Sequence, residues 1–112
     1  MSVRNPFGTA DTSNAMTATG VQAFTITNSL TIIDGVTVEA TGNRTLNLTL
    51  SSELRAGDML LVRNQTNGTE TLTFGTGITA PVQTGVAGTI HNQLFMYNGT
   101  GFEATGADQQ IN

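Results

Sequence analysis

The sequence predicts an all-β fold, a single compact β-sandwich, jelly roll or small barrel, and two observations carry this prediction. Apolar and polar residues alternate with a period of two in several short segments, as in strands that bury one face. Turn signals rich in Gly, Asn and Asp recur roughly every 8 to 12 residues, a spacing typical of sandwiches and barrels. A chain of 112 residues corresponds to one domain, and no segment clearly supports a helix.

Two neighbouring segments in the middle of the chain form the centre of the predicted domain. Leu46, Leu48 and Leu50 alternate with polar residues, which puts the three leucines on one face of a strand and predicts that they are core residues. Ser51–Asp58 then breaks the pattern and contains a Gly-Asp turn signal. Met59–Val62 is an apolar run of the length of a buried strand. The pattern therefore predicts a strand, a corner and a second strand.

Before this centre, Val21–Ile26 alternates as a strand, and Leu30–Val38 contains the dipeptide Asp34-Gly35. Asp-Gly is a common two-residue hairpin signal. A hairpin closed at this point would leave apolar and polar groups mixed on both faces. A bent or bulged strand with Gly35 at the bulge fits the pattern equally well, so both interpretations stay open.

After the centre, Asn67-Gly68 is the cleanest hairpin signal in the chain. It is expected to join Leu60–Thr66 to Thr69–Phe74 as neighbouring antiparallel strands, with Leu61 facing Phe74 across the ladder.

The last third of the chain is expected to form one loop and one hairpin. Gly75–Gly88 has four glycines and a proline, which indicates a loop with a short edge segment. Thr89–Tyr97 is a strand pattern, Asn98–Gly101 a turn, and Phe102–Thr105 a returning strand. Gly106–Asn112 is expected to be a short polar tail.

The N-terminal stretch differs from the rest, which predicts a flexible arm at residues 1–20 and a β-domain at residues 21–112. The first twenty residues contain no Leu or Ile and cannot bury enough apolar area to offset the entropy of ordering. They are either a frayed terminus or an arm that becomes ordered on a partner. In the second case Arg4, Phe7 and Met16 are the candidate partner-binding residues.

Composition excludes several classes of partner. Only 11% of the residues are charged, against a usual value of about 25%, and the net charge is −4 with no lysine. Nucleic-acid binding and membrane binding through a basic patch are therefore not expected. No apolar segment reaches the length of a membrane span. Threonine and asparagine take the place of charge, which indicates either a threonine-coated exterior or a surface that meets other proteins at low desolvation cost.

No pattern in the chain indicates chemistry. Gly75–Ala80 fits the permissive dinucleotide fingerprint, which requires a helix directly after it. The Pro and Gly residues that follow are incompatible with a helix. His91 is the single histidine and there is no cysteine, so a metal cluster or a Ser-His-Asp triad has no support. The acids are scattered, so a glycosidase pair is not singled out. The sequence predicts no catalytic, cofactor-binding or metal-binding residue, and hence a protein that is not an enzyme.

Three features together resemble small virion proteins of tailed bacteriophages. They are the polar N-terminal stretch before a single β-domain, the loop-to-strand segment Leu54–Val62, and the aromatic–turn–aromatic segment Phe95–Phe102. The chain resembles head decoration proteins, also called cement or auxiliary capsid proteins, and short head fibres. The resemblance implies a cofactor-free homotrimer on the outer surface of the capsid, bound to the major capsid protein, with no nucleic-acid or membrane partner.

The expected function is therefore to decorate and stabilise a viral shell, with the arm on the shell and turns such as Asn98–Gly101 pointing outward. The alternative is a carbohydrate- or host-binding tip domain of a fibre, in which Phe95, Tyr97 and Phe102 are candidate stacking residues. Self-association is expected through strands with apolar groups on both sides, namely Ile32–Val38 and Leu94–Tyr97.

Overall fold

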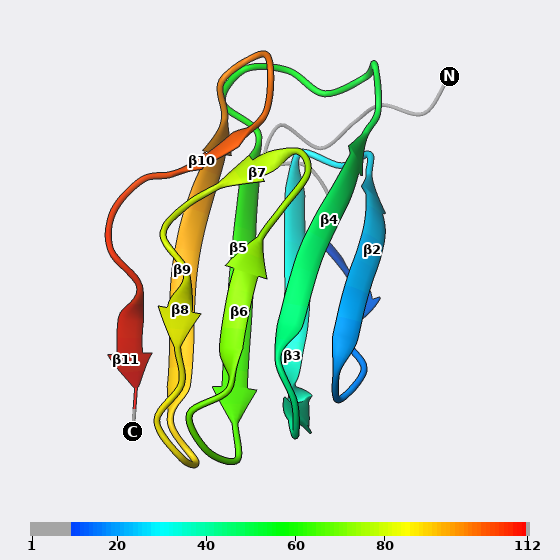
Figure 1. Ribbon diagram of the computed structural model, residues 1–112. Helices are drawn as coiled ribbons and strands as arrows, with labels where there is room; N and C mark the ends of the chain where they lie inside the picture. Colours follow the sequence, from blue (N-terminus) through cyan, green and yellow to red (C-terminus); the bar gives the residue numbers. More distant parts are fainter. Residues whose placement is uncertain (1–9, 112) are drawn as a thin grey trace.

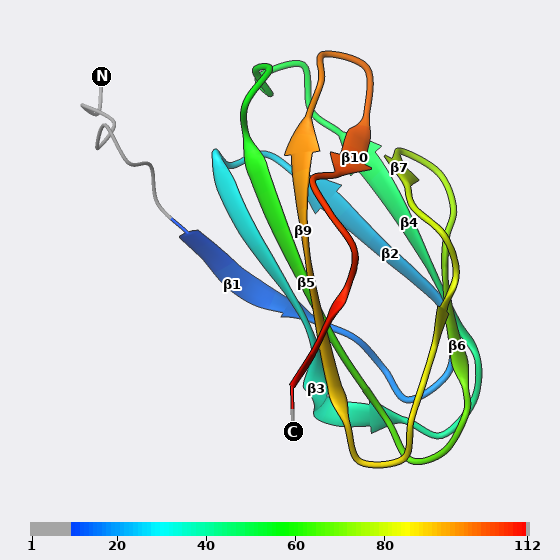
Figure 2. The same cartoon turned by 90° about the vertical axis from the view of Figure 1, so that its left-hand side faces the viewer.

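The computed structural model describes residues 10–111, which form eleven β-strands and no helix. The all-β prediction is confirmed. The strands lie in two sheets that face each other across one core (Figures 1 and 2). The strands are β1 Ala10–Ala15, β2 Gly20–Ile26, β3 Leu30–Ala40, β4 Arg44–Leu50, β5 Met59–Thr66, β6 Thr71–Phe74, β7 Ile78–Thr79, β8 Gln83–Thr84, β9 Ile90–Tyr97, β10 Phe102–Ala104 and β11 Gln109–Ile111.

The first six strands alternate between the two sheets. β1, β3 and β5 enter the larger sheet as parallel neighbours, and β2, β4 and β6 enter the smaller sheet in the same way. Each strand therefore pairs with the strand two places away in the sequence, and the chain winds around the core. β9 then pairs antiparallel with β5, and its other edge carries β10 and β11. β8 completes the smaller sheet next to β6.

The core lies between the inner faces of the two sheets. Leu46 and Leu48 of β4 are buried, and Leu50 packs against the same cluster, which confirms the predicted leucine face. Alternate residues of β5 and β9 complete it from the opposite side: Leu60 and Phe95 have no exposed surface. The period of two places one face of every long strand in this core.

The hairpin predicted at Asn67-Gly68 is wrong. β5 belongs to the larger sheet and β6 to the smaller one, so the connection crosses the core instead of closing a ladder. A type I′ turn requires positive φ at both central residues, and neither Asn67 nor Gly68 has it. Asn67 instead donates its backbone N–H to Ala40 O at 3.0 Å. Val62 of β5 and Leu72 of β6 are both fully buried in the core between the two sheets. The free energy gained by this burial outweighs the local preference for a turn.

β3 is one continuous strand, so the bulged-strand interpretation of Asp34-Gly35 is the correct one. The register with β5 shifts after Gly35. Glycine is required at position 35 by lack of space and not by a positive φ. A Cβ at this position would lie 2.7 Å from Arg63 O and 3.0 Å from an Arg44 guanidinium nitrogen.

That guanidinium is a buried hub between the sheets. The Arg44 side chain is 1% exposed. It donates to Asn64 Oδ1 at 2.6 Å and to the carbonyl oxygens of Thr17, Gly35 and Val38 at 2.9–3.1 Å. Burial lowers the pKa of this guanidinium, but arginine stays protonated in proteins. Arg44 therefore ties β4 of the smaller sheet to the bulge of β3 and to β5.

Both chain ends differ from the expectation. The arm was expected to run to residue 20, but β1 pairs with β3 and Met16 is buried in the core at 1% exposure. The segment Ala10–Met16 is ordered although it lacks large aliphatic residues. Its backbone pairs with β3, and the side chain of Met16 packs in the core. The expected polar tail likewise contains β11, whose Gln109 pairs with Asn92 of β9.

Candidate interaction surfaces

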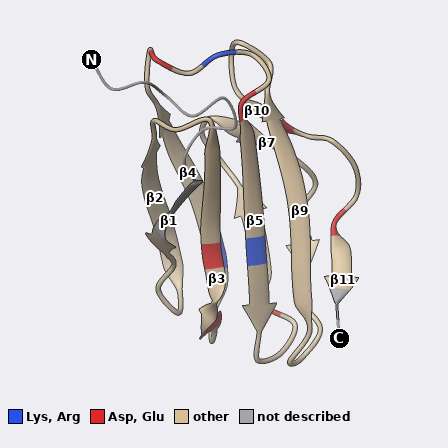
Figure 3. Cartoon of the chain, turned by 180° about the vertical axis from the view of Figure 1, so that it is seen from behind, with Lys and Arg blue, Asp and Glu red and all other residues tan. Residues whose placement is uncertain are grey.

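The outer face of the larger sheet carries a block of apolar side chains from three adjacent strands. The strand registers align them in two rows, one through Leu30, Met59 and Met96 and one through Ile32, Leu61 and Leu94. Leu94 and Met96 are 42% and 41% exposed, and the other four are partly exposed. These six residues are called the apolar face below. Figure 3 looks onto this side of the sheet, where the strands carry few charged residues.

The next row of the same face holds one acid and one base on neighbouring strands. Asp34 of β3 pairs in register with Arg63 of β5 (Figure 3). The Asp34 carboxylate instead accepts the Thr37 hydroxyl at 2.6 Å and the Val36 N–H at 2.8 Å. These hydrogen bonds, led by that from Thr37, hold the pKa of Asp34 below its ordinary value. Arg63 donates from Nε to Asn92 Oδ1 at 3.2 Å.

The two charges therefore do not form an ion pair with each other. Within the described chain no arginine side chain forms an ion pair with a carboxylate. Asp34 and Arg63 are left as two fixed, opposite charges next to the apolar face.

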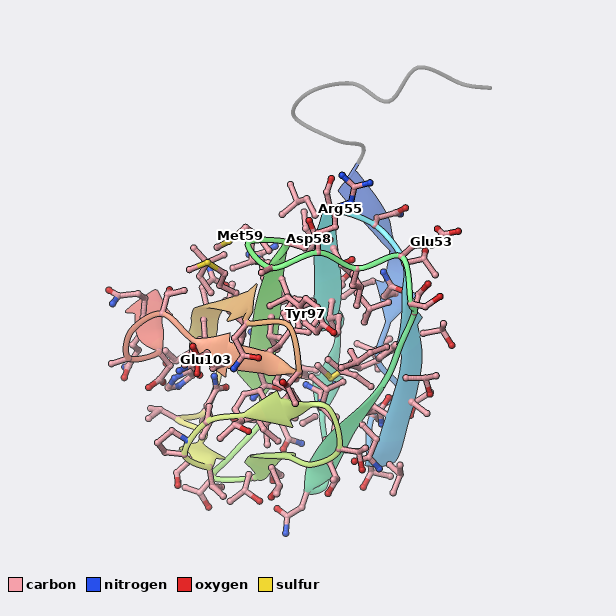
Figure 4. The ribbon with its side chains drawn as sticks, turned by 90° about the horizontal axis from the view of Figure 1, so that it is seen from above. Glu53, Arg55, Asp58, Met59, Tyr97 and Glu103 are labelled. Carbon is pink, nitrogen blue, oxygen red and sulfur yellow. The ribbon has the colours of Figure 1, made fainter. Side chains whose placement is uncertain are left out.

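The second candidate surface is one end of the molecule, made by the segment Ser51–Asp58 and the turn Asn98–Gly101 (Figure 4). We call it the loop end. The two segments are joined at Tyr97, whose N–H donates to Asp58 O and whose carbonyl accepts from Gly57 N–H, both at 2.8 Å. Charged side chains gather here, namely those of Glu53, Arg55, Asp58 and Glu103 (Figures 3 and 4).

The described chain also begins at the loop end. Ala10 pairs with Leu30, and Leu30 lies in one row with Met59 and Met96, directly below the loops. The sequence interpretation placed the Asn98–Gly101 turn on the outward side; in the structure this turn shares the loop end with the Ser51–Asp58 segment.

The structure brings together only part of the predicted aromatic platform. Phe95 is 0% and Phe102 1% exposed, so neither can stack on a sugar; both are core residues. Tyr97 is partly exposed, packs against Phe102 with ring centroids 5.4 Å apart, and donates its hydroxyl to Gly99 O at 3.0 Å. An open cavity of about 320 Å³ next to this turn is lined by Thr79, Asn98, Thr100, Phe102, Glu103 and two glycines.

Among the partner-binding residues predicted in the arm, Met16 is the one that the described chain contains. Its burial in the core means that it cannot contact a partner. Arg4 and Phe7 lie outside the described residues.

The buried histidine serves the fold. His91 is on the inner side of β9 and bonds through Nδ1 to Asp108 Oδ2 at 2.5 Å, which fastens the segment before β11 to the sheet. Residues 10–111 contain no group of three His, Asp or Glu side chains placed to hold a metal. In the Gly75–Ala80 segment, Ile78 and Thr79 form a strand and no helix follows, so the fingerprint match is coincidental.

Comparisons with known proteins add no relative. A scan against protein-family models, a search of curated proteins and a search of solved structures each returned no match. The described part of the chain has no helix of the length and hydrophobicity that a membrane crossing needs.

Sequence reasoning anticipated apolar groups on both sides of these strands but not their assembly into one face. The signal was the presence of apolar residues on both sides of Ile32–Val38 and Leu94–Tyr97, which is typical of strands covered on both sides. The alignment of rows across β3, β5 and β9 depends on a register that no local pattern specifies.

Proposed function

We propose that the protein is a structural virion protein that decorates the outer surface of a phage head, binds the major capsid protein through its loop end, and does no chemistry. The observation that carries this proposal is the meeting of the Ser51–Asp58 segment and the Asn98–Gly101 turn at one end of the molecule, with Ala10 in register with Leu30 of the adjoining row. Two loops held together at one end can engage one extended surface together.

The physical character of the loop end suits attachment to a lattice. Each of its loops is short, and its backbone is fixed by the paired hydrogen bonds at Tyr97, so little entropy is lost on binding. Many weakly bound copies on a repeating shell would add their effects through multivalency. In this proposal the Asn98–Gly101 turn faces the shell, and the end with the β5–β6 connection points outward.

Binding of purified protein to heads that lack it tests the proposal. Deletion of residues 2–9 removes Arg4 and Phe7 but leaves β1 and Met16 in place. We expect the deletion to weaken binding by at least about tenfold and to leave the unfolding midpoint unchanged, because it removes no described core contact.

Deletion of residues 2–20 is the matched control, which should lower the midpoint by removing Met16 from the core. Cryo-electron microscopy of the source virion gives the decisive outcome. A particle without the protein, or with the protein inside against the genome, would overturn the proposal.

One observation favours a carbohydrate-binding fibre tip as the second candidate. The cavity at the loop end offers the side chains of Thr79, Asn98, Thr100 and Glu103, which are hydrogen-bonding groups suited to sugar hydroxyls. A glycan array separates the two functions: a specific glycan whose binding is lost in Glu103→Gln supports the tip domain, and an empty array counts against it.

A further inference from the structure

We propose that the outer face of the larger sheet binds a second copy of this chain across a two-fold axis that runs along the strands between β3 and β5. We infer that the partner is a second copy because the residues of this face are complementary to the same residues of a copy related by the two-fold rotation. The inference concerns the free protein and stands independently of the proposed capsid contact.

The apolar rows match themselves under this rotation. A two-fold axis along the strands keeps every row at its own level and lays β3 of one copy over β5 of the other. Leu30 then faces Met59, and Ile32 faces Leu61, each pair occurring twice as in any two-fold interface. Leu94 and Met96 lie over β1 of the second copy, which flanks β3. Face-to-face sheets pack about 10 Å apart, a separation that such side chains fill.

The charges select the position of the axis. The same rotation lays Asp34 of one copy over Arg63 of the other, and the reverse, so each charge gains an opposite charge from the second copy beside its in-register neighbour. An axis centred on β5 would instead oppose Arg63 to itself. The hydrogen bonds that fix the Asp34 carboxylate keep it ionised and in place without occupying all of its acceptor positions.

The covered face also explains the sequence of these strands. The equally parallel strands β4 and β6 carry threonine and asparagine outward, so parallel pairing alone does not require an apolar outer face. β3 and β5 are parallel and carry apolar residues toward both sides. Four strands about 4.8 Å apart and about 20 Å long give a contact of about 400 Å² on each copy, the size of a weak interface, so we expect a dissociation constant no tighter than about the micromolar range.

Light scattering on the free protein is the first test. At about 100 µM we expect twice the 11.7 kDa mass of one chain. A mass of one chain at this concentration overturns self-association, and three times this mass, the homotrimer that the resemblance implies, overturns the two-fold arrangement.

The second test locates the surface. Leu61→Glu puts a charge in the centre of the apolar face and should weaken the dimer at least about 100-fold. Leu61→Thr, which a strand accommodates, should weaken it about tenfold and guards against misfolding. The matched control is Val21→Glu on the outer face of β2, where the side chain is 67% exposed. Dissociation by the control, or none by either Leu61 variant, overturns the assignment of the face.

The third test concerns the charge pair. Arg63→Glu sets a carboxylate against Asp34 of the second copy and should weaken the dimer about tenfold. Asp34→Asn keeps an oxygen acceptor for the Val36 N–H while removing the charge. Added to R63E, it should recover part of the lost affinity because it relieves the repulsion. Additive effects of the two substitutions overturn the proposed position of the axis.

The fourth test reads the direction of the strands. The chain has no cysteine, so Asn67→Cys accepts a single spin label at the end opposite the loop end. With the axis along the strands the two labels lie about 20 Å apart, whereas an antiparallel arrangement would separate them by about 50 Å. A long distance overturns the arrangement.

The two proposals fail separately. A protein that is monomeric in solution but binds phage heads would contradict only this inference, and a dimer that does not bind heads would contradict only the proposed function.

Discussion

The two sheets of this protein have similar inner faces and opposite outer faces. On the smaller sheet the outward side chains of β4 and β6 are Thr45, Asn47, Thr49, Thr71 and Thr73, all neutral and hydrogen-bonding. The corresponding positions on β3, β5 and β9 form the apolar face. Threonine is β-branched and so favours a strand while it remains hydrated.

The difference teaches that one low-charge sequence can build two kinds of surface. The composition alone was compatible with a threonine-coated exterior and with a protein-binding surface. The fold has both and assigns one to each sheet. We interpret the smaller sheet as the side that is complete in water and the larger sheet as the side that a protein partner completes.

The largest effect should come from the inner faces. Leu48→Ala removes a side chain that is 3% exposed in the core and should cost about 2–5 kcal/mol of unfolding free energy. Leu94→Ala on the apolar face is the matched control and should cost less than about 0.5 kcal/mol when the protein is kept monomeric by dilution. Urea titration measures both. Equal costs would mean that the inner face of the smaller sheet and the apolar face of the larger sheet are not distinct.

A smaller effect is expected where the two sheets are tied together. Arg44→Lys keeps the charge but cannot reach Asn64 and the three carbonyl oxygens of the hub at once, so it should cost about 2 kcal/mol. The control is Arg55→Lys, an exposed arginine of the loop end that should change stability by less than about 0.5 kcal/mol. Thermal unfolding of both variants compares them. An unchanged midpoint in R44K would show that water or side-chain rearrangement replaces the hub.

The smallest effect is a pH dependence on the outer face of the larger sheet. Because the folded pKa of Asp34 is lowered, its stabilising contribution is present above the pKa of the unfolded chain and is lost as the pH falls through the folded value. Stability should therefore decrease as the pH falls below about 4. Asp34→Asn should flatten this part of the profile, and an unaltered profile would assign the acid sensitivity to other carboxylates.

Local patterns were sufficient to predict strands but not their partners. The alternation at Leu46, Leu48 and Leu50 depends on burial of one face, and the turn at Asn98–Gly101 depends on local backbone conformation, so both were predictable. The crossing after Thr66 was not, because which sheet a strand joins depends on contacts distant in sequence. β1 was missed for the same reason: its order comes from β3 and not from its own side chains.

The candidate surfaces were predictable to a smaller extent. Apolar groups on both sides of β3 and β9 were visible as a pattern, but the match of Asp34 with Arg63 exists only once the parallel register is formed. The loop end was not predictable, because nothing in the sequence states that the Ser51–Asp58 segment and the Asn98–Gly101 turn meet at one end.

The alternation of early strands between the two sheets has a consequence for how this chain reaches its native state. Between β1 and β6 no strand pairs with its successor, so every ladder must close a loop that contains a strand of the other sheet. Loop-closure entropy is lost before any of these contacts forms, which is typical of folding in milliseconds to seconds. The tight β9–β10 hairpin is the exception. We therefore expect the transition state to form around β9, with the N-terminal windings added late.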